Sequence, residues 1–359
     1  MRRIASLLVS FAFFLLAGCA GLALDQPGVR GAAINTGVER LADQALIAAD
    51  GTRLPLRSWL PDGPPKAVIL ALHGMNDYSH AFAAPGAAWA KVGVATYAYD
   101  QRGFGQAPRR GLWAGTWQLA DDAATASSLL RRRYPGVPLF LLGESMGGAV
   151  AITAVTGTAG APRPPVDGII LAAPAVWGRE TMTLPERVAL WTGDRLFPSA
   201  TFTGGGLNIL PSDNIEMLRG LSRDPLVIKA TRVDAIKGLV DLMDLALASA
   251  PLLDVPTLVL YGERDEIIPR EPTEKWISEL PFDARFTRRI ALYDRGYHIL
   301  LRDLEAPIVW RDVASWIADH HAPLPSGADR RASDLLYANG AAAPVATAAV
   351  PKPTDRAEN

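Results

Sequence analysis

A serine set between glycines is the residue best placed to act as a nucleophile in this chain. Ser145 lies in Gly143-Glu144-Ser145-Met146-Gly147, after the apolar run 138–142 and before a run of small residues that favours a helix. A nucleophile on a sharp strand-to-helix turn needs small neighbours two positions away on each side. The helix start also favours developing negative charge. The pattern predicts a nucleophilic Ser145; the simpler alternative is a serine that caps a helix.

A nucleophilic serine requires a base, and histidine is the usual one. The chain has five histidines, at positions 73, 80, 298, 320 and 321. His298 comes just after the last predicted strand, in a loop at the same carboxyl edge of the sheet as Ser145. The other four follow the first buried strand, lie near a helix start or end the last helix. We therefore expect His298 to be the base, against the alternative of a structural loop histidine.

An acidic partner is needed to orient the imidazole and stabilise its charged form. Asp265 follows the predicted strand 257–261 and is our choice, although spacing alone leaves Glu263 and Glu266 open. The resulting chain order, serine then acid then histidine, is the order found in α/β hydrolases.

Five collinear segments give the chain, from about residue 54 to 316, a resemblance to α/β hydrolases of the monoacylglycerol lipase and lysophospholipase group. They are Leu72-His73-Gly74-Met75, Asp100-Gln101-Arg102-Gly103-Phe104-Gly105, Gly143-Glu144-Ser145-Met146-Gly147-Gly148, Gly262-Glu263-Arg264-Asp265 and Gly296-Tyr297-His298. The resemblance implies a catalytic triad of Ser145, Asp265 and His298. It also implies an oxyanion hole made by the backbone N–H groups of Met75 and Met146.

The same resemblance implies a structural role for His73, which would shape the oxyanion loop, and a reaction without a metal or cofactor. One departure follows directly. Where the family often has Gly-Glu-His after its His-Gly pair, this chain has Asn76-Asp77-Tyr78. Any contact that the family makes at these positions is therefore open.

Apolar runs alternate with helical stretches along the chain. Strands are expected at 67–72, 94–99, 137–142, 168–172, 257–261 and 288–292, and helices at about 80–91, 116–133, 146–156, 271–280 and 306–320. A hairpin around Asp50-Gly51 precedes them. Most strands are apolar on both faces, as strands covered by helices on both sides must be. The alternation predicts an α/β fold with a mostly parallel central sheet, and the resemblance implies that this is the α/β-hydrolase fold.

Residues 175–250 interrupt this alternation and are predicted to form a helical cap inserted in the α/β-hydrolase domain 43–321. Their aromatic and aliphatic content fits an acyl-binding groove, with Trp177 and Trp191 as candidate substrate contacts. Plain packing of a helical cap is the alternative.

The chain begins with two arginines, an apolar run and Leu16-Ala17-Gly18-Cys19. This order of a basic start, an apolar run and small residues predicts a signal peptide over 1–18, and the ending resembles the lipobox of bacterial lipoproteins. That resemblance implies lipidation of Cys19 and anchoring in the cell envelope, at the outer membrane because Ala20 is not aspartate. An uncleaved anchor or an ordinary signal peptide is the alternative. Residues 19–42 are expected to be a tether, and the Ala/Pro-rich 322–359 a flexible tail.

Composition excludes several classes of protein. A chain with 49% hydrophobic and 20% charged residues is neither disordered nor collagen-like. The net charge of -1 gives no general attraction to nucleic acid. One cysteine permits no internal disulfide, and the scattered histidines offer no zinc framework. The oligomeric state is not indicated.

The expected function is hydrolysis of carboxylic esters through an acyl-enzyme, with a monoacylglycerol or lysophospholipid as substrate. Activity should fall below about pH 6.5, where an unperturbed histidine is protonated. A short-chain esterase, a thioesterase and an acyltransferase are alternatives on the same fold. A non-catalytic envelope lipoprotein is the alternative from a different class.

Overall fold

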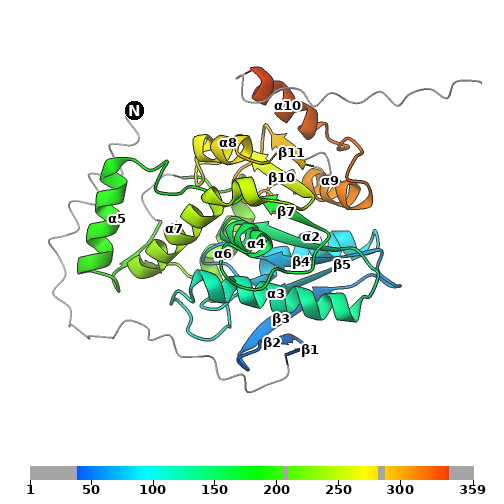
Figure 1. Ribbon diagram of the computed structural model, residues 1–359, viewed down its shortest axis with the longest axis horizontal. Coiled ribbons are helices and arrows are strands. Elements are labelled where there is room, and N and C mark those ends of the chain that lie inside the picture. The colour runs from blue at the N-terminus through cyan, green and yellow to red at the C-terminus, as the bar shows by residue number, and fades with distance from the viewer. Residues whose placement is uncertain (1–38, 205–208, 282–287, 339–359) are drawn as a thin grey trace, which may run out of the picture.

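A nine-stranded sheet runs through the middle of the structure (Figure 1). The computed structural model describes residues 39–204, 209–281 and 288–338. The strand order is β1 (Arg40–Ala42), β2 (Ala45–Ile47), β3 (Arg53–Trp59), β5 (Val94–Tyr99), β4 (Ala67–Leu72), β6 (Leu139–Glu144), β7 (Gly168–Ala172), β10 (Thr257–Gly262) and β11 (Arg288–Tyr293). The strands from β5 to β11 are parallel, and β1, β2 and β3 pair antiparallel at one edge.

Helices cover both faces of this sheet, which explains the continuous apolar strands. Every residue of β4, β5, β6, β7 and β10 is buried. One core cluster packs beneath α3 (Thr116–Arg133), α4 (Met146–Thr156), α7 (Val233–Ala248) and α8 (Arg270–Ser278). The other packs beneath η2 (Ser79–Phe82), α2 (Ala83–Ala90) and α9 (Ala306–Ala318). The predicted α/β architecture is confirmed.

The interval predicted as a helical insertion holds α5 (Leu184–Leu196), β8 (Thr201–Phe202), α6 (Ile215–Arg223), β9 (Thr231–Arg232) and α7. It is mainly helical, with one short antiparallel pair between β8 and β9. In Figure 1, α5 stands apart from the layers at the left of the view. Helix α7 differs from the expectation of a cap, because Leu242 and Ala246 are fully buried in the main core. A crossover between the parallel strands β7 and β10 needs such a helix against the sheet.

The N-terminal predictions fall mostly outside the described residues. The signal peptide 1–18, Cys19 and the tether up to residue 38 are among the undescribed part. The end of the expected tether forms β1, whose Leu41 lies opposite Leu46 and packs against the main core. Within the described ranges, no helix has the length and apolar character needed to cross a membrane.

The expectation of a flexible tail is wrong for residues 322–338, because helix α10 (Ala328–Ala338) forms there. Ala328 and Ala332 are buried and lie four residues apart, on one face of the helix, and Leu324 is buried in the segment that precedes it. The helix packs against the edge strand β11, and Arg331 donates a hydrogen bond of 2.9 Å to the Leu292 carbonyl. Composition alone had favoured a tail because alanine is abundant there; burial on the sheet supplies the order instead. Residues 339–359 lie outside the described part.

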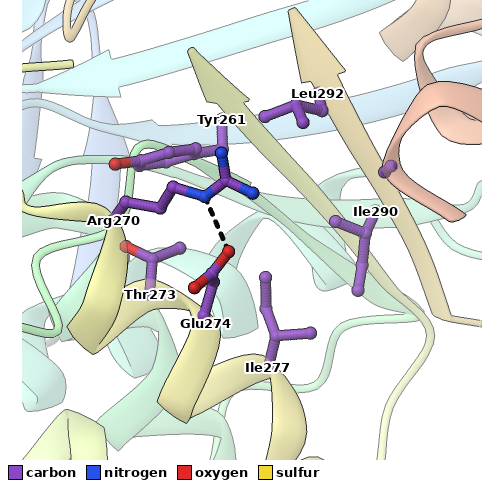
Figure 2. A pocket seen from close by; sticks show the side chains of 8 residues that line it. Tyr261, Arg270, Thr273, Glu274, Ile277, Ile290 and Leu292 are labelled. Carbon is purple, nitrogen blue, oxygen red and sulfur yellow. Dashed lines mark hydrogen bonds and ion pairs between the residues drawn. The ribbon is translucent and has the colours of Figure 1, made fainter. Parts of the chain in front are cut away.

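A small pocket lies where α10 meets the sheet edge. Its lining residues come from β10, α8, β11 and α10 and are Tyr261, Arg270, Thr273, Glu274, Ile277, Ile290, Leu292 and Ala332. Figure 2 shows Arg270 and Glu274 of α8 joined by a hydrogen bond, with Ile277 at the bottom of the view and Ile290 and Leu292 at the right, on β11. Helix α10 therefore covers the edge strand β11. An edge strand that is covered in this way cannot pair with a strand of another chain.

Removing α10 should destabilise the fold. Protein ending at residue 321 loses the buried Leu324 and the Arg289–Asp329 ion pair. Its free energy of unfolding should fall by about 3 kcal/mol, chiefly through lost apolar burial. Thermal and denaturant unfolding measure this. Protein ending at residue 338 is the control and should unfold like the full chain. Equal stability of all three proteins would contradict a structural role for α10.

Candidate active site

Ser145 occupies a strained turn between β6 and α4. Its backbone has φ 53° and ψ −116°, in the region that non-glycine residues avoid. The amide donates to the Ala172 carbonyl at 2.9 Å, and the carbonyl accepts from Ala175 at 3.0 Å. Ser145 is partly exposed, although its neighbours on both sides are buried. The turn therefore presents the hydroxyl at the carboxyl edge of the sheet.

The two flanking glycines are required by close approach of the backbone. A Cβ on Gly143 would lie 2.3 Å from the Gly147 carbonyl oxygen, and a Cβ on Gly147 would lie 2.1 Å from the Leu72 carbonyl oxygen. No side chain fits at such distances. The turn therefore requires glycine at both positions for the steric reason inferred from the sequence.

His298 and Asp265 are brought together by the loops after β11 and β10. His298 Nδ1 and Asp265 Oδ2 lie 2.8 Å apart. Asp265 Oδ1 accepts from the amides of Ile267 and Ile268, at 2.8 and 3.0 Å, so the carboxylate is fixed in orientation. Its side chain is fully buried. The other candidate carboxylates, Glu263 and Glu266, are exposed. Glu266 accepts a hydrogen bond from the Leu210 amide, whereas Asp265 is the carboxylate that contacts His298 Nδ1.

The loop that carries His298 is held on both sides of the histidine. The Tyr297 amide donates to Asp303 at 2.8 Å, and the Ile299 amide donates to the Pro211 carbonyl at 3.0 Å. Ser212 donates to the other oxygen of Asp303 at 2.5 Å. Burial raises the pKa of Asp303 to about 6. Pro211 and Ser212 belong to the insertion, so the insertion helps to set the position of the imidazole.

The charge balance around His298 favours its protonated form. Burial lowers the pKa of the imidazole, but the carboxylates of Asp265, Glu144 and Asp303 outweigh burial, and the pKa is raised above its ordinary value of 6.5. The Asp265 contribution is the largest of the three. Because Nδ1 faces Asp265, Nε2 is the nitrogen left to take a proton from another group.

The loop after β4 lies against Ser145. A Cβ built on Gly74 would be 3.3 Å from the Ser145 Cβ and 3.9 Å from its Oγ. His73 fixes this loop. Its Nε2 accepts from the Gln101 amide at 2.9 Å, so Nδ1 carries the proton and donates to the Gly74 carbonyl at 2.8 Å. A ring that accepts at Nε2 is neutral, and burial, the largest cause, lowers the pKa of His73.

This contact also orients the next amide. In a trans peptide the C=O and N–H groups point in opposite directions. Holding the Gly74 carbonyl toward His73 therefore turns the Met75 N–H away from it. Met146 is the first residue of α4, where the N–H groups have no acceptor within the helix. The two amides assigned to the oxyanion hole from the sequence thus come from the loop beside Ser145 and from the helix that follows it.

The segment Asn76-Asp77-Tyr78, which departs from the resembling family, has partners of its own. Asn76 has φ 68° and donates to the Thr231 hydroxyl at 2.7 Å. Its carbonyl accepts from the Ile228 amide at 2.9 Å. The Tyr78 hydroxyl donates to Asp224 at 2.7 Å. These partners are all residues of the insertion.

Asp77 points to a different partner. It accepts from Arg302 Nη2 at 2.6 Å, and the same nitrogen lies 3.3 Å from Glu144 Oε2. Sequence reasoning missed Arg302 and Glu144. Their closeness to His298 and Ser145 in the chain was a signal, but nothing local indicates that the two loops share an ion pair.

The two tryptophans lie in different surroundings. Trp177 follows β7 and is partly buried against the main core. Trp191 is 64% exposed on α5, with the Arg195 guanidinium over its ring. Leu184 and Val188, on the same exposed face of α5, are also exposed. Among the described residues, no three His, Cys, Asp or Glu side chains gather as a metal site requires.

Comparison with known proteins adds to this geometry. Residues 63–305 match the family described as serine aminopeptidase, S33 (Hydrolase_4). A monoacylglycerol lipase of Mycolicibacterium smegmatis is 24% identical over 78% of the chain and 98% of its own length. The human monoglyceride lipase is 26% identical over 77% of the chain and 90% of its own length.

A solved structure shares the fold. The monoacylglycerol lipase of Paleococcus ferrophilus superposes with a TM-score of 0.62 at 22% identity, covering 74% of this chain and 99% of the other. The expected α/β-hydrolase fold, with its mostly parallel sheet and flanking helices, is confirmed.

The charge on Glu144 should be measurable at His298. Replacing Glu144 by glutamine removes one of the carboxylates that raise the imidazole pKa, so the His298 pKa should fall from its raised value. A titration of the imidazole resonances by NMR measures this. Glu263→Gln, at an exposed position nearby, is the control and should leave the His298 pKa unchanged. An equal His298 pKa in the wild-type protein and the Glu144→Gln variant would contradict the contribution assigned to the Glu144 carboxylate.

Proposed function

Since the chain belongs to the serine aminopeptidase S33 family, we propose that it cleaves monoacylglycerols or lysophospholipids through a serine, histidine and aspartate triad. It is a carboxylic ester hydrolase; both curated relatives described above are lipases of single-chain glycerol esters by name. The observation that carries the triad is the strained turn that presents Ser145 at the edge where His298 meets Asp265.

The proposed reaction is acyl transfer to water in two steps. Ser145 Oγ attacks the ester carbonyl carbon, and His298 Nε2 takes the hydroxyl proton as the C–O bond forms. The tetrahedral intermediate collapses, the ester C–O bond breaks, and His298 gives the proton to the leaving alcohol. Water then attacks the acyl-enzyme in the same way and releases the fatty acid. Asp265 orients the imidazole and stabilises its positive charge throughout.

The developing oxyanion would be held by the Met75 and Met146 amides. The support for this is the position of Gly74 against Ser145 and the tether of its carbonyl to His73. Each such donor is worth ~2.7–4 kcal/mol of the barrier. This chemistry involves no metal or cofactor.

A lipid-like substrate is supported by the apolar residues of the insertion. The exposed set there comprises Leu184, Val188, Trp191, Leu196, Phe197, Phe202, Leu210 and Ile215. Leu184, Val188 and Trp191 share one face of α5, and an exposed apolar face of this kind suits contact with an apolar ligand or interface. We extend the proposal to a lipid anchor on Cys19 at the outer membrane, which would keep the enzyme beside its substrate. Short esters, thioesters or an alcohol acceptor in place of water would use the same acyl-enzyme.

Ser145→Ala tests the function directly. Monoacylglycerols and p-nitrophenyl esters from acetate to stearate should be hydrolysed by the protein lacking residues 1–19. Turnover should fall by about 10⁴-fold or more in the variant, as when a triad member is lost. Ser145 should also react with a fluorophosphonate. Turnover of short esters alone would reject the lipid assignment, and an unreactive serine would favour a non-catalytic lipoprotein.

The two tryptophans test the acyl-binding role of the insertion. Trp177→Ala and Trp191→Ala should each lower kcat/KM for long-chain esters more than for acetate, because a long chain has more apolar surface to bury. Progress curves on matched p-nitrophenyl esters give both values. Trp117→Ala is a control at an exposed tryptophan outside the insertion. Equal losses on long and short chains would contradict this role.

A further inference from the structure

A buried ion cluster lies beside the proposed active site and is not used by the mechanism above. Arg302 Nη2 donates to Asp77 Oδ2 at 2.6 Å and to Glu144 Oε2 at 3.3 Å. The three side chains are 11%, 11% and 4% exposed, in that order. Charges removed from water to this extent are costly unless each has a partner. Arg302 is the cation that both carboxylates share.

Each member of the cluster belongs to a different catalytic segment. Asp77 is two residues beyond Met75, in the loop that follows β4. Glu144 ends β6 and directly precedes Ser145. Arg302 is four residues beyond His298, and its own carbonyl accepts from Asn214 Nδ2 at 2.9 Å. One guanidinium thus connects the oxyanion loop, the nucleophile turn and the histidine loop.

We propose that Arg302 is a positioning residue for ester hydrolysis. Through Asp77 it holds the oxyanion loop, and through Glu144 it holds the nucleophile turn, so that both keep a fixed position relative to the loop of His298. This rests on the proposed function. The planar guanidinium suits the task because its donors are fixed in direction, whereas a lysine offers a single flexible ammonium.

The charge of Arg302 also supports a positioning role. Burial raises the pKa of Glu144, and Arg302 opposes that rise. Without Arg302, two buried carboxylates would face each other next to Ser145, where negative charge must develop on the oxyanion. The repulsion would be relieved by protonation of Glu144 or by separation of the loops. Either change removes the connection between the loops, and a displacement of about 1 Å at reacting groups costs on the order of 10²-fold in rate.

The test compares Arg302→Gln and Arg302→Lys with Arg102→Gln. Arg102 is the matched control: it also binds two carboxylates, Asp50 and Asp122, at 13% side-chain exposure, but in a different part of the fold. Kinetics on p-nitrophenyl butyrate and thermal unfolding are measured for each. Arg302→Gln should lower kcat by roughly 10–100-fold with KM changed less than about threefold. Arg302→Lys should recover part of the loss, and Arg102→Gln should lose stability with little loss of kcat.

The outcomes separate this inference from the proposed function. Wild-type kcat in folded Arg302→Gln would overturn the positioning role, as would a loss of kcat that Arg102→Gln reproduces. If Arg302→Gln does not fold, Asp77→Asn decides, because it removes the shorter ion pair and keeps the side-chain volume; unchanged kcat there would overturn the inference. Absence of Ser145-dependent turnover in the wild-type protein would overturn the proposed function and the inference together.

Discussion

The close approach of backbone around Ser145 is the constraint on which the rest of the structure depends. With φ at 53°, the turn is held by hydrogen bonds of its amide to Ala172, the last residue of β7, and of its carbonyl to Ala175, and Gly143 and Gly147 leave room for neighbouring carbonyls. Strain of this kind persists where the surroundings determine it from several sides. Three neighbouring parallel strands supply those surroundings at their carboxyl ends: β4 through Leu72, β6 through Gly143 and β7 through Ala172.

Much of the fold and the chemistry could be predicted from local pattern. The strand 67–72 was predicted to the residue, because a strand buried on both faces is apolar throughout. Ser145, Asp265 and His298 could be proposed because each follows a strand whose end is recognisable. The structure then separated Asp265 from Glu263 and Glu266, which spacing could not, since that choice depends on side-chain direction across two loops.

The parts that escaped prediction are contacts between distant segments. Helix α10 has an alanine-rich sequence and packs against β11, a contact that composition does not reveal, although the spacing of Leu324, Ala328 and Ala332 was a usable signal. Arg302 lies 158 positions from Glu144 and 225 from Asp77, so no local rule joins them. Helix α7 was assigned to the insertion because its sequence is helical there, but its buried face shows that it serves the core as well.

The insertion contacts both loops that flank the serine. Asn76 and Tyr78 bind it on the side of the oxyanion loop, while Ile299 and Asp303 bind it on the side of the histidine. An insertion attached in this way is not an interchangeable module. Grafting the corresponding segment of a relative onto this sheet would change the alignment of the reacting groups together with the shape of the binding surface, so selectivity and turnover would change together.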